Sequence, residues 1–140
     1  MSFKFEFDAD SRVLRARFQG LVNDVILGDF YSQTAAYVER TSPRAGITDF
    51  SDVTSFQVSA AAVRTMAASA PSAKDPHFLR VVVAPAAHIF GLARMFQMFG
   101  EMTRPGMVVV RSLQEALDIL GVAEPHFEPV DPEQSDERVV

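Results

Sequence analysis

Few side chains in this sequence have the types and spacing that catalysis or metal binding requires. The histidines, His77, His88 and His126, lack the i, i+3 or i+4 spacing with which a helix holds a metal ion. The absence of cysteine excludes thiol nucleophiles and thiolate metal sites. Neither a Gly-x-Ser-x-Gly turn nor a glycine-rich phosphate loop occurs. We therefore expect no catalytic residue, no metal and no cofactor. An enzyme that depends on Asp49 or His88 ranks third, behind the two non-enzymatic functions given at the end of this subsection.

A polar segment after a predicted buried strand is the first candidate contact region. Residues 46–50 are expected to form the strand, and residues 51–56 to form a loop at its carboxyl end, where ligands of parallel sheets bind. Two acids three residues apart in such a loop are typical of turn formers and helix caps. The contact residues expected here are Asp49, Ser51, Asp52 and Phe56. Ser59 follows them and is expected to begin an alanine-rich helix.

The second candidate region is a helix predicted for residues 87–102, which is more apolar than a surface helix needs to be. Its apolar side chains cover far more than a stripe of roughly 100°: Ile89, Phe90, Leu92, Met95, Phe96, Met98, Phe99 and Met102. Positions 92, 95, 96 and 99 can face a sheet, whereas positions 90, 98 and 102 face elsewhere. Three coverings stay open: Phe127 near the C-terminus, a second copy of the chain, and an apolar ligand or membrane surface.

Arg94 interrupts this apolar helix. It is expected to reach solvent or to pair with Asp49 or Asp52. The functional alternative is that Arg94 holds the acidic head of an amphipathic ligand whose tail lies along Phe90 and Met98.

The elements that position these residues follow from hydrophobic periodicity. Phe3, Phe5 and Phe7 alternate with charged residues, and a second alternating segment at residues 14–18 completes an opening hairpin. A helix is expected over residues 23–40 and another over 59–70, with strands at 79–84 and 107–110 and a last helix at 112–120. The order β-β-α-β-α-β-α-β-α predicts an α/β domain with a mixed, mainly parallel five-stranded sheet and about four helices.

Charge separates this domain from the end of the chain. Six of the eighteen acidic residues and one of the thirteen basic residues lie in residues 123–140, which leaves residues 1–122 with twelve of each. We expect one domain over residues 1–122 and an acidic, proline-containing tail over 123–140, the first part of which Phe127 and Val130 could anchor. A neutral body offers no basic face to nucleic acid. With neither a signal peptide nor a transmembrane segment in the sequence, we expect a cytoplasmic protein.

Two segments, together with the order of elements, carry a resemblance to a known family. These are Ile89-Phe90-Gly91-Leu92-Ala93-Arg94-Met95-Phe96 and Arg111-Ser112-Leu113-Gln114-Glu115-Ala116-Leu117-Asp118-Ile119-Leu120. Over roughly residues 3–120 the chain resembles the SpoIIAA-like family of small bacterial proteins. That family shares its fold with STAS domains (sulfate transporter and anti-sigma factor antagonist) and is related to lipid-binding CRAL-TRIO modules. The resemblance implies a non-enzymatic binder or regulator of STAS-like fold.

The resemblance also singles out Ser59. Regulatory STAS proteins carry a phosphorylated serine in an Asp-Ser-Ser-Gly context, and the corresponding residues here are Val58-Ser59-Ala60-Ala61, which lack the acid and the glycine. A helix N-terminus would favour a phosphate on Ser59. The alternative is that Ser59 is only a helix cap.

Two functions from different classes follow from these expectations. The first is a non-enzymatic regulatory or protein-binding module that forms a homodimer, with residues 51–59 and 91–102 as its contact regions. The second is a carrier or sensor of an apolar or amphipathic, lipid-like ligand, with peripheral contact to a membrane.

Overall fold

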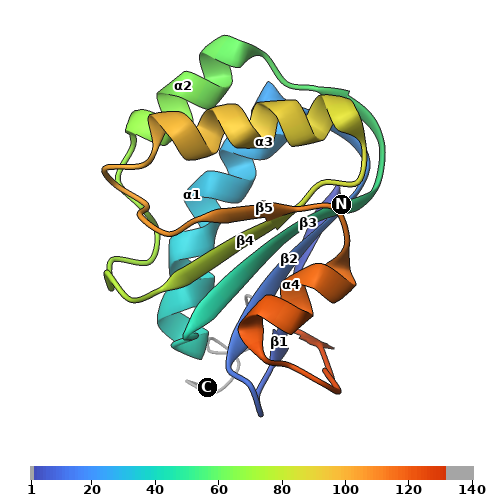
Figure 1. Ribbon diagram of the computed structural model, residues 1–140, viewed down its shortest axis with the longest axis vertical. Helices are drawn as coiled ribbons and strands as arrows, with labels where there is room; N and C mark the ends of the chain where they lie inside the picture. Colours follow the sequence, from blue (N-terminus) through green and yellow to red (C-terminus); the bar gives the residue numbers. More distant parts are fainter. Residues whose placement is uncertain (1, 132–140) are drawn as a thin grey trace, which may run out of the picture.

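The computed structural model describes residues 2–131, which form an α/β domain with four helices and a mixed six-stranded sheet (Figure 1). The elements in chain order are β1 (Phe3–Asp8), β2 (Val13–Asn23), α1 (Asp24–Thr41), β3 (Ala45–Gln57), α2 (Ala60–Ala68), β4 (Leu79–Val83), α3 (Ala87–Phe99), β5 (Val108–Val110), α4 (Leu113–Leu120) and β6 (Glu128–Pro129). The strands lie in the order β5-β4-β3-β2-β1-β6.

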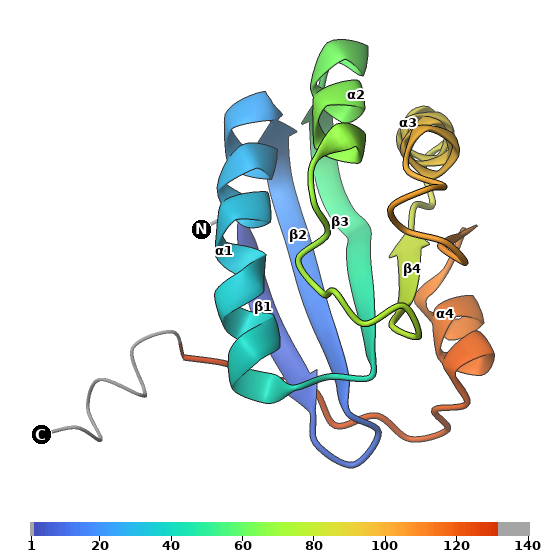
Figure 2. The same ribbon diagram turned by 90° about the vertical axis from the view of Figure 1, so that its left-hand side faces the viewer.

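The sheet is parallel from β2 to β5 and antiparallel where β1 meets β2 and β6. Three helices, α1, α2 and α3, contribute to the core on one face, and α4 packs on the other face against β3, β4 and β5. Figure 2 shows α1 running beside β1 and β2, with α2 and α3 next to each other at the upper end of the molecule. Because strand side chains alternate, Ile47 of β3 faces α4 while Phe50 faces the other three helices.

Local sequence signals set the beginnings of α1 and α4 and the end of α4 as expected. The Asn23 side chain caps α1 by accepting a hydrogen bond from the Ile26 N–H at 2.9 Å. Ser112 caps α4 by accepting from the Glu115 N–H at 3.2 Å, which is the first half of the predicted capping box, and the Glu115 carboxylate accepts from the Ser112 hydroxyl rather than from its backbone N–H. Gly121 ends α4 in the left-handed conformation at φ +71°.

Two predicted boundaries are wrong. Residues 51–56 are not a loop, because β3 runs on to Gln57 beside the second half of β2. The register shifts at two points along β2, and Gly20, at φ +72°, supplies the unusual backbone at one of them. The helix predicted to reach Met102 ends at Phe99, where Gly100 takes the C-cap position.

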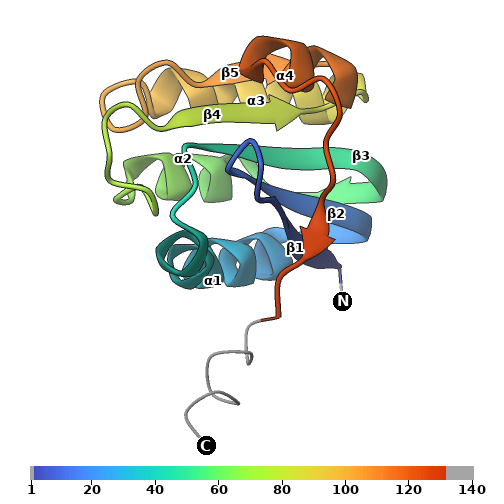
Figure 3. The same cartoon turned by 90° about the horizontal axis from the view of Figure 1, so that it is seen from below.

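The predicted five-stranded sheet gains a sixth strand from the beginning of the acidic segment. Strand β6 pairs with β1, and the Val130 N–H donates to the Phe5 carbonyl at 2.9 Å (Figure 3). Phe127 packs on the core cluster under α4, with Arg15 over its ring at 5.4 Å. Phe127 and Val130 therefore anchor this segment, whereas residues 132–140 of the predicted tail lie outside the described residues.

Asp8 joins the end of β1 to this C-terminal segment. Its side chain is buried, and it accepts hydrogen bonds from the Ser11 hydroxyl and from the His126 N–H at 3.4 Å. Burial acts to raise the pKa of Asp8, but the hydrogen bonds from Ser11 and His126 outweigh burial and lower the pKa below its ordinary value of 3.8.

Candidate functional site

A cavity of about 170 Å³ lies between the sheet and helices α1, α2 and α3. Its walls are mostly apolar, and its main apolar lining residues are Phe5, Leu14, Ala16, Leu27, Phe30, Val38, Phe50, Phe56, Val63, Met66, Phe78, Val82, Ile89, Leu92, Ala93, Phe96 and Met107. The polar groups in its walls come from Tyr31, Thr34, Thr48, Ser72, Arg80 and Arg104. Neither an acid nor a histidine lines it. The site is therefore a pocket of the kind that binds an apolar molecule through a few placed polar groups.

Small residues on facing elements leave this space open. Ala16 on β2, Gly46 on β3 and Ala93 on α3 all line the cavity, so neither sheet nor helix fills it with long side chains there. At Gly46 a side chain would be crowded, because a Cβ would lie 3.1 Å from Cζ of Phe78 and the ring would have to move by a few tenths of an ångström. The Phe78 ring is thus packed directly on the backbone of β3 as part of the cavity wall.

Arg80 is the second residue of β4, where it lies in register with Gly46 of β3, and its side chain forms part of the cavity wall. Alternation along the strand places Arg80 on the same face as Val82, which belongs to the core under α1, α2 and α3. Its Nη2 donates to the Ala73 carbonyl at 2.5 Å, and its guanidinium lies 5.0 Å from the centre of the Phe78 ring.

Arg104 comes from the loop between α3 and β5 and is only 4% exposed. Its Nη1 donates to the Ala67 carbonyl of α2 at 3.2 Å, and its Nη2 donates to the Tyr31 hydroxyl of α1. The guanidinium also lies 5.0 Å from the centre of the Phe96 ring of α3. Arg104 therefore touches all three helices that cover the cavity.

These two cations have no carboxylate beside them. Among residues 2–131, no ion pair joins Arg80 or Arg104 to an acid, whereas Arg15 pairs with Glu6 and Asp49, and Arg17 pairs with Asp52. Burial lowers the pKa of Arg104, and burial together with the nearby charge of Arg104 lowers the pKa of Arg80. Both guanidiniums stay protonated at neutral pH, so this end of the cavity carries two positive charges that no acid of residues 2–131 neutralises in an ion pair.

Tyr31 completes the polar end. Its hydroxyl donates to the Ala70 carbonyl at 2.5 Å and accepts from Arg104. Burial raises the pKa of Tyr31, while the charges of Arg104 and Arg80 act to lower it. The phenol is therefore neutral at physiological pH and adds no negative charge to balance the arginines.

The acids predicted as contact residues lie elsewhere, and of the two alternatives for Arg94 the pairing with Asp49 or Asp52 is wrong and the solvent exposure is confirmed. Asp49 is 1% exposed, and its Oδ2 binds Nη2 of Arg15 at 2.5 Å. The other oxygen of Asp49 accepts from the backbone and hydroxyl of Ser51 at 2.9 and 2.5 Å. Asp52 pairs with Arg17 at 2.8 Å. The pairing follows from sheet geometry: β2 lies directly beside β3, and alternation along β3 places Asp49 on the face of the sheet opposite to Phe50 and α3.

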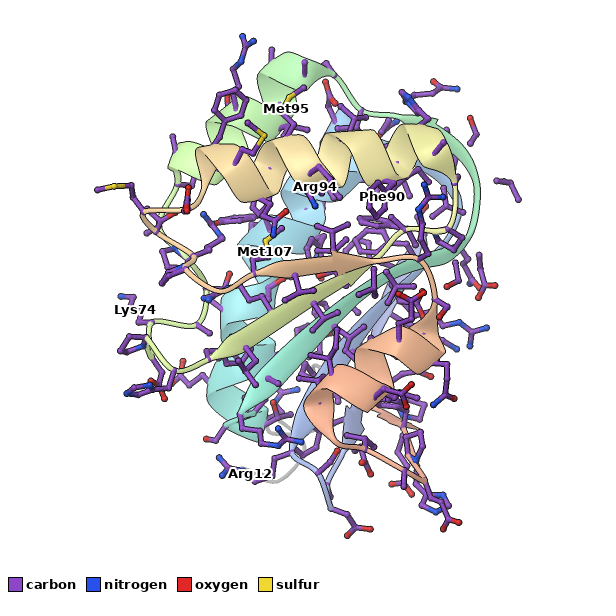
Figure 4. The ribbon with its side chains drawn as sticks, in the orientation of Figure 1. Arg12, Lys74, Phe90, Arg94, Met95 and Met107 are labelled. Atoms are coloured by element: carbon purple, nitrogen blue, oxygen red, sulfur yellow. The ribbon has the colours of Figure 1, made fainter. Side chains whose placement is uncertain are left out.

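The apolar helix α3 divides its side chains between the cavity and the surface. Figure 4 shows Met95 on the α2 side of α3 and Arg94 on its opposite side, with Met107 just below the helix. Phe90 is partly buried beneath Arg111, whose guanidinium lies 4.3 Å from the ring centre. Arg94 is exposed.

Beyond Arg94 the surface of α3 is apolar. Met98 is 70% exposed and Met102 is 96% exposed, as expected for positions that face away from the sheet. Phe99 was expected to face the sheet, but it is 52% exposed because the helix ends there. Phe127 does not cover this surface, since it packs under α4.

Phe56 and Ser59 occupy different surroundings. Phe56 lines the cavity, and its ring contacts that of Phe50 at 5.4 Å. Ser59 caps α2 as predicted, accepting from the Ala62 N–H at 3.1 Å, and its hydroxyl donates to Asp24 at 2.9 Å. A carboxylate thus already lies where a phosphate on Ser59 would have to fit, and phosphorylation of Ser59 stays a prediction.

Sequence reasoning missed Arg80, Arg104 and Tyr31. One signal was present, because Arg80 is the single charge within a run of residues expected to be buried on both faces of a strand. No local signal marks Arg104, which lies in the turn Thr103-Arg104-Pro105-Gly106. Of the predicted contact residues, Phe56 lines the cavity, and Arg94 does not.

The fold and the cavity define the class to which this protein belongs: an α/β protein with a mixed six-stranded sheet and an internal apolar pocket. In comparisons with known proteins, no family model matches the chain and no curated protein matches it. Within residues 2–131, no three His, Asp or Glu side chains are grouped so that they could hold a metal ion. None of the described helices is long and apolar enough to cross a membrane.

Proposed function

We propose that this protein is a non-enzymatic carrier or sensor that binds a small apolar or amphipathic molecule in the cavity. The single observation that carries the proposal is a space of about 170 Å³ beneath α1, α2 and α3 with an almost continuous apolar lining. An engineered apolar cavity of roughly 150 Å³ binds benzene. By that comparison, the cavity has room for one ring or a chain of about six to eight carbons.

Two features support binding rather than catalysis. The lining has no acid or histidine that could act as a general base, and its hydroxyl groups have no such base beside them in the cavity. The strongest charges at the site are arginines, which do not exchange protons near neutral pH. We also propose a STAS-like fold of the SpoIIAA-like type, supported by the order β-β-α-β-α-β-α-β-α up to α4.

The proposal is tested by titrating the protein with 1-octanol and following side-chain methyl resonances by NMR. We expect saturable shifts at Ile89, Leu92 and Met107, whose side chains line the cavity. The methyl groups of Met98 and Met102, which are 70% and 96% exposed, serve as the control for nonspecific contact. Shifts that are confined to Met98 and Met102, or that fail to saturate, would contradict the proposal.

The second candidate function is a regulatory or protein-binding module that works as a homodimer in the cytoplasm. The observation that favours it is a group of exposed apolar side chains, formed by Met98 and Phe99 at the end of α3 and by Met102 in the turn after it. Surfaces of this kind mark contacts between proteins. Light scattering tests this candidate: a dimer that falls to monomer in Met98→Asp, but not in the control Ala87→Asp, supports it, and a monomeric wild type rules it out.

A further inference from the structure

We infer that the natural ligand is a small anionic amphiphile whose carboxylate or phosphate is held by Arg80 and Arg104, with its apolar tail directed along the cavity. This inference rests on the proposed binding function and adds the chemical class of the ligand. It comes from the placement of two cations at one end of an apolar space, together with the lack of any acid beside them.

The backbone places the two arginines at one end of the cavity. Arg80 lies opposite Gly46 at the beginning of the parallel strands, whereas Phe56 lies near the far end of β3. Arg104 belongs to the loop that precedes β5, so it lies at the same end of the sheet as Arg80. The wall beyond them is formed by apolar side chains such as Phe56, Val63 and Ile89. A ligand with one polar end and one apolar end matches this division.

Both guanidiniums have donors to spare. Each arginine side chain carries five N–H donors in a planar fork that suits carboxylate and phosphate oxygens. In the described residues, Arg80 uses only Nη2, toward Ala73, and Arg104 uses Nη1 and Nη2. The Nε groups of both and Nη1 of Arg80 have no hydrogen-bond partner within residues 2–131. These donors are available to the oxygens of an anion.

The charge balance favours an anion over a neutral head group. Two guanidiniums that repel each other, neither of them in an ion pair with an acid of residues 2–131, raise the free energy of the folded protein. Bonds from Arg104 to Ala67 and Tyr31 join the helices, but these carbonyl and hydroxyl acceptors neutralise no charge. Arg80 likewise donates to the Ala73 carbonyl, which leaves its charge in place. A bound anion that both cations share would neutralise this charge.

The first experiment compares ligands that share an eight-carbon tail and differ in their head group, using calorimetric titration of the wild-type protein. We expect octanoate or octyl phosphate to bind at least about tenfold more tightly than 1-octanol, since a charge-assisted hydrogen bond is worth more than a neutral one. The stronger of the two anions identifies the head group. Octylammonium should not bind. Octanol that binds as tightly as both anions overturns the inference and leaves the proposed function standing, whereas failure of all four ligands overturns both.

The second experiment assigns the anion to the arginines. Arg80→Gln should weaken binding of the preferred anion about 10- to 100-fold and leave octanol unchanged. The matched control is Arg94→Gln, which removes an equal charge from the exposed face of α3 and should leave the affinity for the anion unchanged. Circular dichroism confirms that each variant is folded. If Arg80→Gln binds the anion as tightly as wild type, or if Arg94→Gln weakens binding equally, Arg80 does not hold the head group.

Discussion

Filling the cavity from α3 should stabilise the protein and abolish its binding function together. Ala93 lines the cavity, so Ala93→Leu adds three carbon atoms to a space that has room for about six to eight. Burying each added carbon contributes about 0.8 kcal/mol, and ordering the leucine side chain costs roughly 0.5 to 1 kcal/mol. Leucine and alanine are both good helix formers. We expect a net gain of about 1.5 kcal/mol in the free energy of unfolding, with a rise in Tm of about 5 °C.

Urea unfolding, monitored by circular dichroism, measures this change. An m-value equal to that of the wild type confirms that the two unfolding transitions can be compared. The control is Ala87→Leu, which adds the same atoms to an exposed position of the same helix and should change stability by less than about 0.5 kcal/mol. Ala93→Leu should also lose saturable binding of 1-octanol. If the free energy of unfolding falls by about 1 kcal/mol or more in Ala93→Leu and is unchanged in Ala87→Leu, the cavity cannot accept these atoms and the reasoning is refuted.

Three further substitutions test the surroundings of the cavity. Gly46→Ala brings a Cβ to 3.1 Å from the neighbouring phenyl ring and should destabilise the protein by about 1 to 3 kcal/mol in urea unfolding, whereas Gly28→Ala, in open space on α1, should stabilise it by up to about 1 kcal/mol. Equal effects would contradict this account. Asp49→Asn removes the shorter of the two ion pairs of Arg15, which keeps Glu6 at 3.4 Å, and should cost about 1 to 3 kcal/mol, against at most about 1 kcal/mol for Asp52→Asn in the exposed pair. Because folding lowers the pKa of Asp8, its stabilising effect is present above pH 3.8 and is lost as the pH falls through the lower pKa of the folded state. Acid titration should therefore destabilise wild type more than Asp8→Asn in this range, and identical pH profiles would exclude such a role.

The elements that the sequence predicted well are those specified by local chemistry. The alternation of Phe3, Phe5 and Phe7 and the caps Asn23, Ser59 and Ser112 each depend on residues within one turn or one strand. The second half of β3 was predicted to be a loop because the segment is as polar as one, and its Ser51 and Thr54 side chains are indeed exposed. What identifies it as a strand is its pairing with β2, which no local pattern encodes.

The candidate site was less predictable because its charged groups come from distant parts of the chain. Arg80 and Arg104 are separated by twenty-three residues, with α3 between them. Likewise, Asp49 of β3 pairs with Arg15 of the neighbouring strand β2, thirty-four positions earlier in the chain, and not with Arg94. Periodicity predicts which face of a strand is buried, but it does not say which cation a buried acid will meet. That choice requires the order of the strands in the sheet.

The two edges of the sheet limit how copies of this protein can associate. The outermost strands, β5 and β6, have three and two residues, and β6 ends on Pro129, which has no N–H to donate. Edges this short offer almost no ladder for a strand from another molecule, which protects the protein from edge-to-edge aggregation. A homodimer would therefore form through helices or loops, not through paired strand edges. Pairing of β6 with β1 covers the edge of β1. Deletion of β6 would expose this six-residue strand edge and should promote aggregation.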